Sequence, residues 1–204
     1  MRRKRTTRVV KTFVSWKLPL LALGAYALAT GSADALFLTL TPKERDAAVE
    51  MGRQSIISDR FGAEWKVSGE GAGEALVVMT PFHRLALAAR NSAFKSEELK
   101  PKDIDSLMRE QEGRLTLWAT LRGNKADFAR FYTPLLVNGQ RQIKASFTQN
   151  ERTARRENDG AYTARCIYVF PTEGLKPGEP LVLLVKDTND TQVAKFTLNL
   201  SAMR

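Results

Sequence analysis

Residues 113–124, GRLTLWATLRGN, decide the fold class of this chain. Every second residue along the stretch is apolar: Leu115, Leu117, Ala119 and Leu121. Such alternation is typical of a β-strand with one buried face. The stretch therefore predicts a strand, with Gly123-Asn124 as the turn that follows. It also marks the point, near Gly113, where the helical pattern gives way to a period of two.

The rest of the C-terminal half repeats this pattern. Strands are predicted near residues 128–133, 135–137, 143–147, 162–170, 181–185 and 194–200. Asn138-Gly139 tolerates positive φ at both positions, which predicts a two-residue hairpin turn between the second and third of these strands. Six or seven short strands without an intervening helix indicate an antiparallel β-sandwich, with an immunoglobulin-like architecture. The Cys…Trp…Cys core signature is missing, so the architecture carries no inference about function.

Helix signals dominate before Gly113. Thr41-Pro42-Lys43-Glu44 predicts a capping box and a helix that continues to about Arg60. Thr80-Pro81 predicts a second helix, which reaches residue 91 or 94, and Asp103 is expected to cap a short third one. Two short strands are expected over residues 63–67 and 75–79. The predicted fold class is α+β, with N-terminal helical segments packed beside a C-terminal antiparallel β-sandwich.

The first 35 residues have the pattern of a secretory signal peptide. A basic head precedes the apolar run LPLLALGAYALA at residues 18–29, and Ala33-Asp34-Ala35 supplies a small-x-small exit. We expect cleavage after Ala35 or after Ala29. An uncleaved anchor over residues 18–40 is the alternative, with the basic head held in the cytoplasm. The predicted organisation is a signal peptide over 1–35, a helical or mixed region over 36–112 and the sandwich over 113–204.

The charge of the chain is concentrated in this leader. The sequence has 32 Lys and Arg against 22 Asp and Glu, a net charge of +10. The leader holds seven of the basic residues and one acidic residue, which leaves 25 against 21, or +4, over residues 36–204. The remainder is only mildly basic, so nucleic acid is not expected as a partner.

Motifs for catalysis or metal binding are absent from the sequence. Cys166 and His83 are the sole cysteine and histidine and lie far apart, so no zinc site and no disulfide is expected. Gly-x-Ser-x-Gly and the Walker phosphate loop are missing as well. We therefore assign no catalytic residue, no metal ligand and no cofactor.

Two groups of residues remain as candidates for binding. The first lies in the helix that begins at Pro81, where free amides favour an anion: His83, Arg84 and Arg90. The second lies in a polar excursion and has the charge to dock an acidic polymer or a lipid headgroup: Arg152, Arg155 and Arg156. A buried or solvated structural role is the competing interpretation for each group.

These observations predict an exported bacterial protein of the periplasm or cell surface. We expect a non-catalytic binding or assembly module whose partner is an envelope protein or a glycan. One alternative is an exported enzyme that uses His83 in a cleft. Another is a structural protein tethered to the inner membrane, which requires an uncleaved signal segment and makes the membrane a partner.

Overall fold

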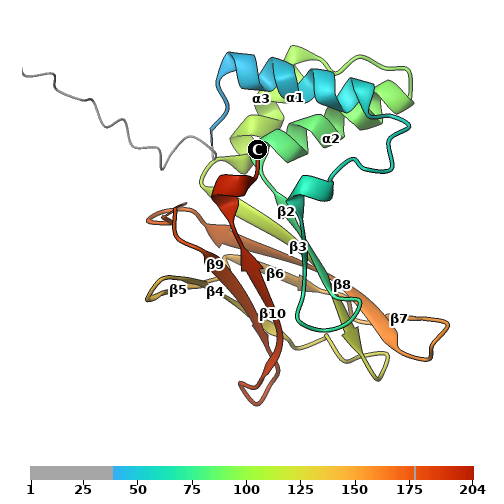
Figure 1. The fold of residues 1–204 in the computed structure, drawn as a ribbon, viewed down its shortest axis with the longest axis vertical. Coiled ribbons are helices and arrows are strands. Elements are labelled where there is room, and N and C mark those ends of the chain that lie inside the picture. Colours follow the sequence, from blue (N-terminus) through green and yellow to red (C-terminus); the bar gives the residue numbers. More distant parts are fainter. Residues whose placement is uncertain (1–38, 177) are drawn as a thin grey trace, which may run out of the picture. The chain divides into compact units, whose positions relative to one another are not determined.

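The computed structural model describes residues 39–176 and 178–204. The predicted signal peptide over 1–35 lies outside these residues, as does the predicted anchor over 18–40 except for its last two residues. Within the described part, no helix is long and apolar enough to cross a membrane. Figure 1 shows the three helices gathered together, with the C-terminal residues beside them.

Helix α1, Pro42–Gln54, begins with the predicted capping box. The Glu44 amide donates to the Thr41 hydroxyl, and the Thr41 amide donates to the Glu44 carboxylate at 2.7 Å. Two orphan amides are thereby satisfied. The helix ends at Gln54, earlier than the predicted Arg60, because the Ser55 amide and hydroxyl both turn back to the carbonyl of Gly52.

Helix α2, Pro81–Phe94, begins where the sequence predicted, with Thr80 as its N-cap. Helix α3, Pro101–Gln111, differs from the prediction at its start. Pro101 is its first residue, and Asp103 lies inside the first turn instead of capping it. Proline fits this position because the first helical amide needs no partner within the helix.

The larger sheet is antiparallel and has six strands. Its path runs β1, Lys66–Ser68; β2, Ala75–Met79; β3, Arg114–Gly123; β8, Tyr162–Pro171; and β6, Phe147–Asn150, with the two-residue β7, Arg155–Arg156, also paired to β8. Strand β3 lies at the centre of this sheet and accounts for nearly all of the alternating stretch over residues 113–124. The region before residue 113 therefore supplies two strands of the sheet, besides the helices.

The smaller sheet is antiparallel and has four strands. Its order is β10, Gln192–Leu198; β9, Leu181–Lys186; β4, Thr133–Asn138; and β5, Arg141–Lys144. A short 3-10 turn, Leu200–Ala202, follows β10, and another, Ala63–Trp65, precedes β1. The fold is thus α+β, with three helices and two antiparallel sheets among the described residues.

Three strand predictions and the hairpin turn were wrong in detail. The strand predicted over 63–67 begins only at Lys66, because residues 63–65 form a 3-10 turn. Residues 128–131 form turns, and β4 starts only at Thr133. The predicted strand over 143–147 is broken at residues 145–146, because the chain leaves the smaller sheet at Lys144 and enters the larger one at Phe147. The hairpin turn is centred on Gly139 and Gln140, one residue later than predicted, since Asn138 pairs with Arg141.

Buried Asn138 explains the shift of this turn. Its side-chain oxygen accepts from the Lys176 amide at 2.8 Å, and its amide group donates to the Lys176 carbonyl. These bonds hold Asn138 as the last residue of β4. Gly139 then supplies the positive φ at the first turn position, as a type II′ turn requires.

Both sheets contribute to one apolar core. Leu117 of β3 and Phe170 of β8 belong to the same buried cluster as Leu183 of β9 and Phe196 of β10. A second cluster joins the helices through Ala48, Phe82 and Leu85. Met203 packs against both clusters, so the C-terminal residues connect the helices to the sheets.

Candidate binding site

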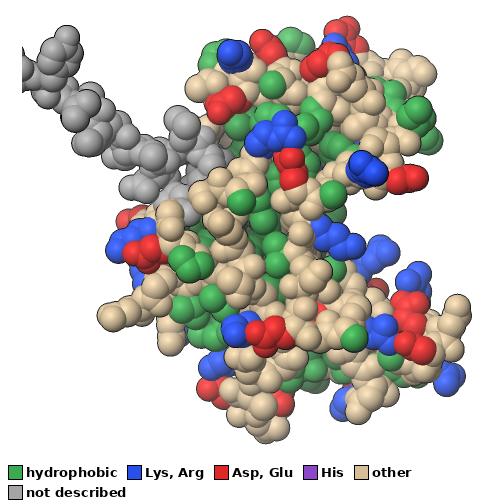
Figure 2. Space-filling view, viewed as in Figure 1, with side chains coloured by type: hydrophobic (Ala, Val, Ile, Leu, Met, Phe, Trp, Pro, Cys, Tyr) green, Lys and Arg blue, Asp and Glu red, His purple; other side chains and the backbone are tan. Residues whose placement is uncertain are grey.

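His83 lies inside the molecule, with 4% of its surface exposed. Its Nδ1–H donates to the carbonyl oxygen of Val78 at 2.9 Å, because a carbonyl can only accept. The imidazole stacks on the indole of Trp65, with ring centroids 4.2 Å apart and an angle of 4° between the planes. The exposed face drawn in Figure 2 accordingly carries no histidine surface.

Burial also sets the charge of His83. It lowers the pKa of the imidazole below its usual value, and the bond to Val78 and the charge of Glu64 oppose this only in part. The side chain is therefore neutral at pH 7. Its backbone amide is already bonded to the Thr80 hydroxyl at 3.1 Å. A free amide and a cationic ring, which an anion would need here, are both missing at His83.

The two arginines predicted with His83 do not converge on it to form a pocket. Arg90 donates to the carbonyls of Ile56 and Ser58 at 3.3 Å, and its guanidinium lies 4.8 Å from the centre of the Phe61 ring. Arg84 is half-buried next to His83 in α2. Arg90 therefore fastens the segment after α1 to α2.

The main-chain oxygen of Arg204 lies beside the stacked rings of Trp65 and His83. It accepts from the Trp65 indole at 2.7 Å and from the Thr80 hydroxyl at 2.5 Å. The Arg204 side chain makes two hydrogen bonds to Glu64. The cluster around His83 thus joins the C-terminal residues to the start of α2, which is a structural task.

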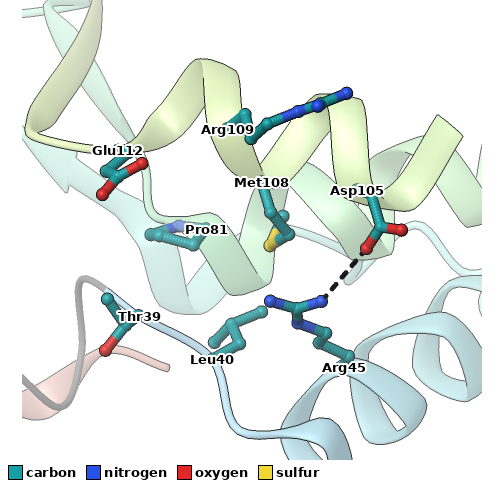
Figure 3. Close-up of a pocket in the computed structure, with 8 residues that line it drawn as sticks. All are labelled: Thr39, Leu40, Arg45, Pro81, Asp105, Met108, Arg109 and Glu112. Atoms are coloured by element: carbon teal, nitrogen blue, oxygen red, sulfur yellow. Dashed lines mark hydrogen bonds and ion pairs between the residues drawn. The ribbon is translucent and has the colours of Figure 1, made fainter. Parts of the chain in front are cut away.

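A cavity of about 480 Å³ lies between α1 and α3 (Figure 3). An ion pair crosses it, from Arg45 Nη1 to Asp105 Oδ1 at 3.3 Å, while Arg109 points away from Arg45. Its remaining carboxylate, Glu112, is at the end of α3. The cavity has no nucleophile beside a base, and no group of acidic, His or Cys side chains in the described residues is suited to a metal ion.

The second predicted group, the arginines of the polar excursion, is divided by the fold. Arg155 donates to Glu157 at 2.8 Å and lines a hollow with Arg165. Arg156 is exposed in β7. Arg152 lines a different hollow, together with Arg130 and Phe131, which the sequence had not grouped with it.

We call this second hollow the β6 groove. It has a volume of about 420 Å³ and is lined by Arg130, Phe131, Thr148, Gln149, Asn150 and Arg152. Phe131 is 64% exposed, and the Arg130 guanidinium lies 5.1 Å from the centre of its ring. The Asn150 amide group donates to the Tyr132 carbonyl at 2.8 Å, which ties the segment before β4 to strand β6.

The outward face of the larger sheet carries a second surface, which we call the apolar stripe. It consists of Val77, Trp118, Phe147, Ile167 and Val169. The pairings Val77↔Trp118↔Ile167 and Val169↔Phe147 place these side chains on one face of neighbouring strands. The alternate residues are buried in the core, so this face is the outer one.

The apolar stripe has a polar surround, in which Glu151 lies beside Arg165. Trp118 is 38% exposed and Phe147 is 51% exposed. Lys66 ends the row that contains Trp118, and Arg165 lies one row away, opposite Thr120. On the face shown in Figure 2, acidic and basic side chains are intermingled. The surface therefore combines an apolar centre with a charged rim, as protein-binding patches do.

No known family model matches this sequence, and a search of curated proteins found no relative. The function is therefore argued from the surfaces alone.

Proposed function

We propose that this protein is an exported, non-catalytic binding or assembly protein of the bacterial envelope, and that it holds a partner protein on the apolar stripe. The observation that carries the proposal is Trp118. Its indole lies on the solvent side of a sheet, between aliphatic neighbours. Aromatic residues at the centre of a patch carry much of the energy of protein association.

A protein partner suits the apolar stripe better than a glycan does. Val77 and Ile167 flank the indole with aliphatic carbon on the neighbouring strands, and Thr116 and Thr120 flank it along β3. A sugar stacked on the indole needs several charged or amide groups beside the ring to bind its hydroxyls, whereas the residues paired with Trp118 across the sheet are aliphatic. Lys66 and Arg165 at the charged rim favour a partner with acidic residues around its own apolar patch.

We further propose that the two sheets form an immunoglobulin-like sandwich. The strand order supports this architecture. The path β2-β3-β8-β6 corresponds to strands A-B-E-D, and β10-β9-β4-β5 corresponds to G-F-C-C′. The two orders also explain why the chain changes sheet between β5 and β6, which are the C′ and D strands. Export and an envelope location rest on the pattern of residues 1–35.

The alternatives differ in what supports them. The enzyme hypothesis needs an accessible His83, and the neutral, stacked and buried imidazole gives it no support. The tethered protein is compatible with the apolar stripe and differs only in the fate of the leader. We therefore retain it as the second candidate.

The test replaces Trp118 by Ala in the full chain. The protein would be cross-linked in cells that make it and recovered from their envelope fraction, with partners identified by mass spectrometry. We expect the partner proteins found with the wild type to fall at least fivefold in yield with Trp118→Ala.

The matched control is Phe94→Ala, which truncates another exposed aromatic residue, at the end of α2. It should leave the recovery unchanged, and both variants should keep the unfolding midpoint of the wild type within a few degrees. Equal recovery with Trp118→Ala and Phe94→Ala would remove the support for this surface. Recovery of glycan instead of protein would overturn the choice of partner.

A further inference from the structure

Strand β6 lies at the edge of the larger sheet and is paired along only one side. Its residues pair with β8, and no other strand of the described residues pairs with it. The other end of the sheet is protected, because the Glu70 amide donates to the Lys195 carbonyl and their side chains form an ion pair at 2.8 Å. An open edge presents unpaired main-chain groups that another extended chain can bind.

Two cationic side chains line the groove at this open edge and lack acidic partners. Arg130 and Arg152 are both exposed and line the β6 groove. No carboxylate of the described residues forms an ion pair with either of them. Nearby arginines differ in this respect, since Arg155 is paired with Glu157 and Arg122 with Asp159. The two free guanidinium groups therefore give the groove a local positive charge.

Phe131 adds an apolar contact to the same groove. Its ring is largely exposed at the groove, between Arg130 and Tyr132 in the sequence. Tyr132, by contrast, is half-buried. A ligand that suits this arrangement offers a main chain for the strand edge, a carboxylate for each arginine and an apolar side chain for the ring. A polypeptide with alternating acidic and apolar residues has all three.

We propose that the β6 groove binds an extended, acidic segment of a partner protein by adding it as a strand to the edge of β6. This inference rests on the proposed binding function and specifies what the partner presents. Main-chain hydrogen bonds to β6 would supply affinity, and the carboxylates would supply specificity. Since β6 has four residues, the bound segment would span about four to six residues.

The test uses a synthetic peptide as the probe, with the sequence acetyl-Ser-Glu-Val-Glu-Val-Glu-Ser-amide and a fluorescent label. Its affinity for the folded protein would be measured by fluorescence anisotropy at low salt. We expect saturable binding that weakens at least fivefold with Arg130→Glu or Arg152→Glu. Lys102→Glu is the matched control, because it reverses one exposed charge in α3, and it should bind the probe like the wild type.

Two further probes separate strand addition from simple charge attraction. Two versions of the peptide would carry N-methyl groups on alternate residues, which block the amides of one edge of the peptide strand at a time. Strand addition predicts that one version binds like the parent peptide and the other loses at least tenfold in affinity. A basic version, with Lys in place of Glu, should bind the double variant Arg130→Glu, Arg152→Glu better than it binds the wild type.

The outcomes that overturn the inference are distinct from those that overturn the proposed function. Failure of the acidic probe to bind, or equal binding by both N-methylated probes, would exclude strand addition at β6. Tighter binding of a single-stranded oligonucleotide than of the acidic peptide would replace the protein segment by a phosphate polymer. The loss of partners with Trp118→Ala does not depend on any of these results.

Discussion

At the scale of single residues, His83 makes the stability of the fold depend on pH. Burial places its pKa in the folded state below the value of about 6.5 in the unfolded chain. The unfolded state therefore takes up the proton first as the pH falls. The stability that neutral His83 contributes is fully present above about pH 6.5 and is lost progressively below it. The loss is about 1.4 kcal/mol for each pH unit over which only the unfolded chain is protonated.

We expect the free energy of unfolding, measured with urea, to fall between pH 7.5 and pH 5.5. His83→Asn should lower stability at both values and abolish most of this slope, since the chain has no other histidine. Burial raises the pKa of Glu74, which acts in the opposite direction, but it does so in both proteins. An unchanged slope in His83→Asn would show that the imidazole is not the group that titrates.

The sequence predicted single residues well where the chemistry is local. Thr41 and Thr80 were identified as caps because an N-cap needs only its own helix. Asn138 was misplaced, because its partner Lys176 is remote in sequence. Trp118 was not among the predicted binding residues, although it lies in the polar phase of β3, with Thr116 and Thr120. The alternation itself therefore contained the signal that it faces outward.

At the scale of elements, α1 and α2 cross at Gly52. A β-carbon added there would lie 2.7 Å from the β-carbon of Ala89 and 2.9 Å from the amide of Arg90, both in α2. Alanine favours a helix over glycine by about 1 kcal/mol, but crowding two backbones costs more. We expect Gly52→Ala to lower the free energy of unfolding by about 1–3 kcal/mol, as measured by chemical denaturation.

Gly178→Ala is the matched comparison. A β-carbon at Gly178 would meet nothing within 4 Å, so this variant should unfold like the wild type. If Gly52→Ala were as stable as Gly178→Ala, the helices would be able to separate without cost. The second core cluster would then be looser than its burial indicates.

The elements themselves were largely predictable, and their sheet membership was not. The period of two identified β3, β8 and β10, because each has one buried face, and a nearly continuous apolar run identified β9. It could not reveal that residues 145–146 carry the chain from one sheet to the other, since a strand has the same period in either sheet. The β6 groove was missed for a related reason. Arg130 and Phe131 come from a turn, and hydrogen bonds from Asn150 to Tyr132 and from Ala154 to Ala126 hold that turn near Arg152.

At the scale of the whole molecule, the fate of the leader decides between the two remaining candidates. We expect the protein isolated from the envelope to begin at residue 36 or residue 30, because a short apolar run after a basic head is removed by signal peptidase. Sequencing of its N-terminus and its intact mass would establish this. Retention of Met1 in the membrane fraction would favour the tethered protein. Replacing Ala33 and Ala35 by Gln should slow the cleavage.

The central strand of the larger sheet has a further consequence. On one side, β3 pairs with β2, which is the preceding strand in the chain. On the other side it pairs with β8, and the pair most distant in sequence is Arg114↔Pro171. The second edge of β3 thus stays vacant until a long intervening stretch has been synthesised, and contacts of such range form slowly. A nascent chain of this topology stays unfolded, and can be threaded, for longer than a chain whose contacts are local. During that interval its apolar face is exposed and open to aggregation.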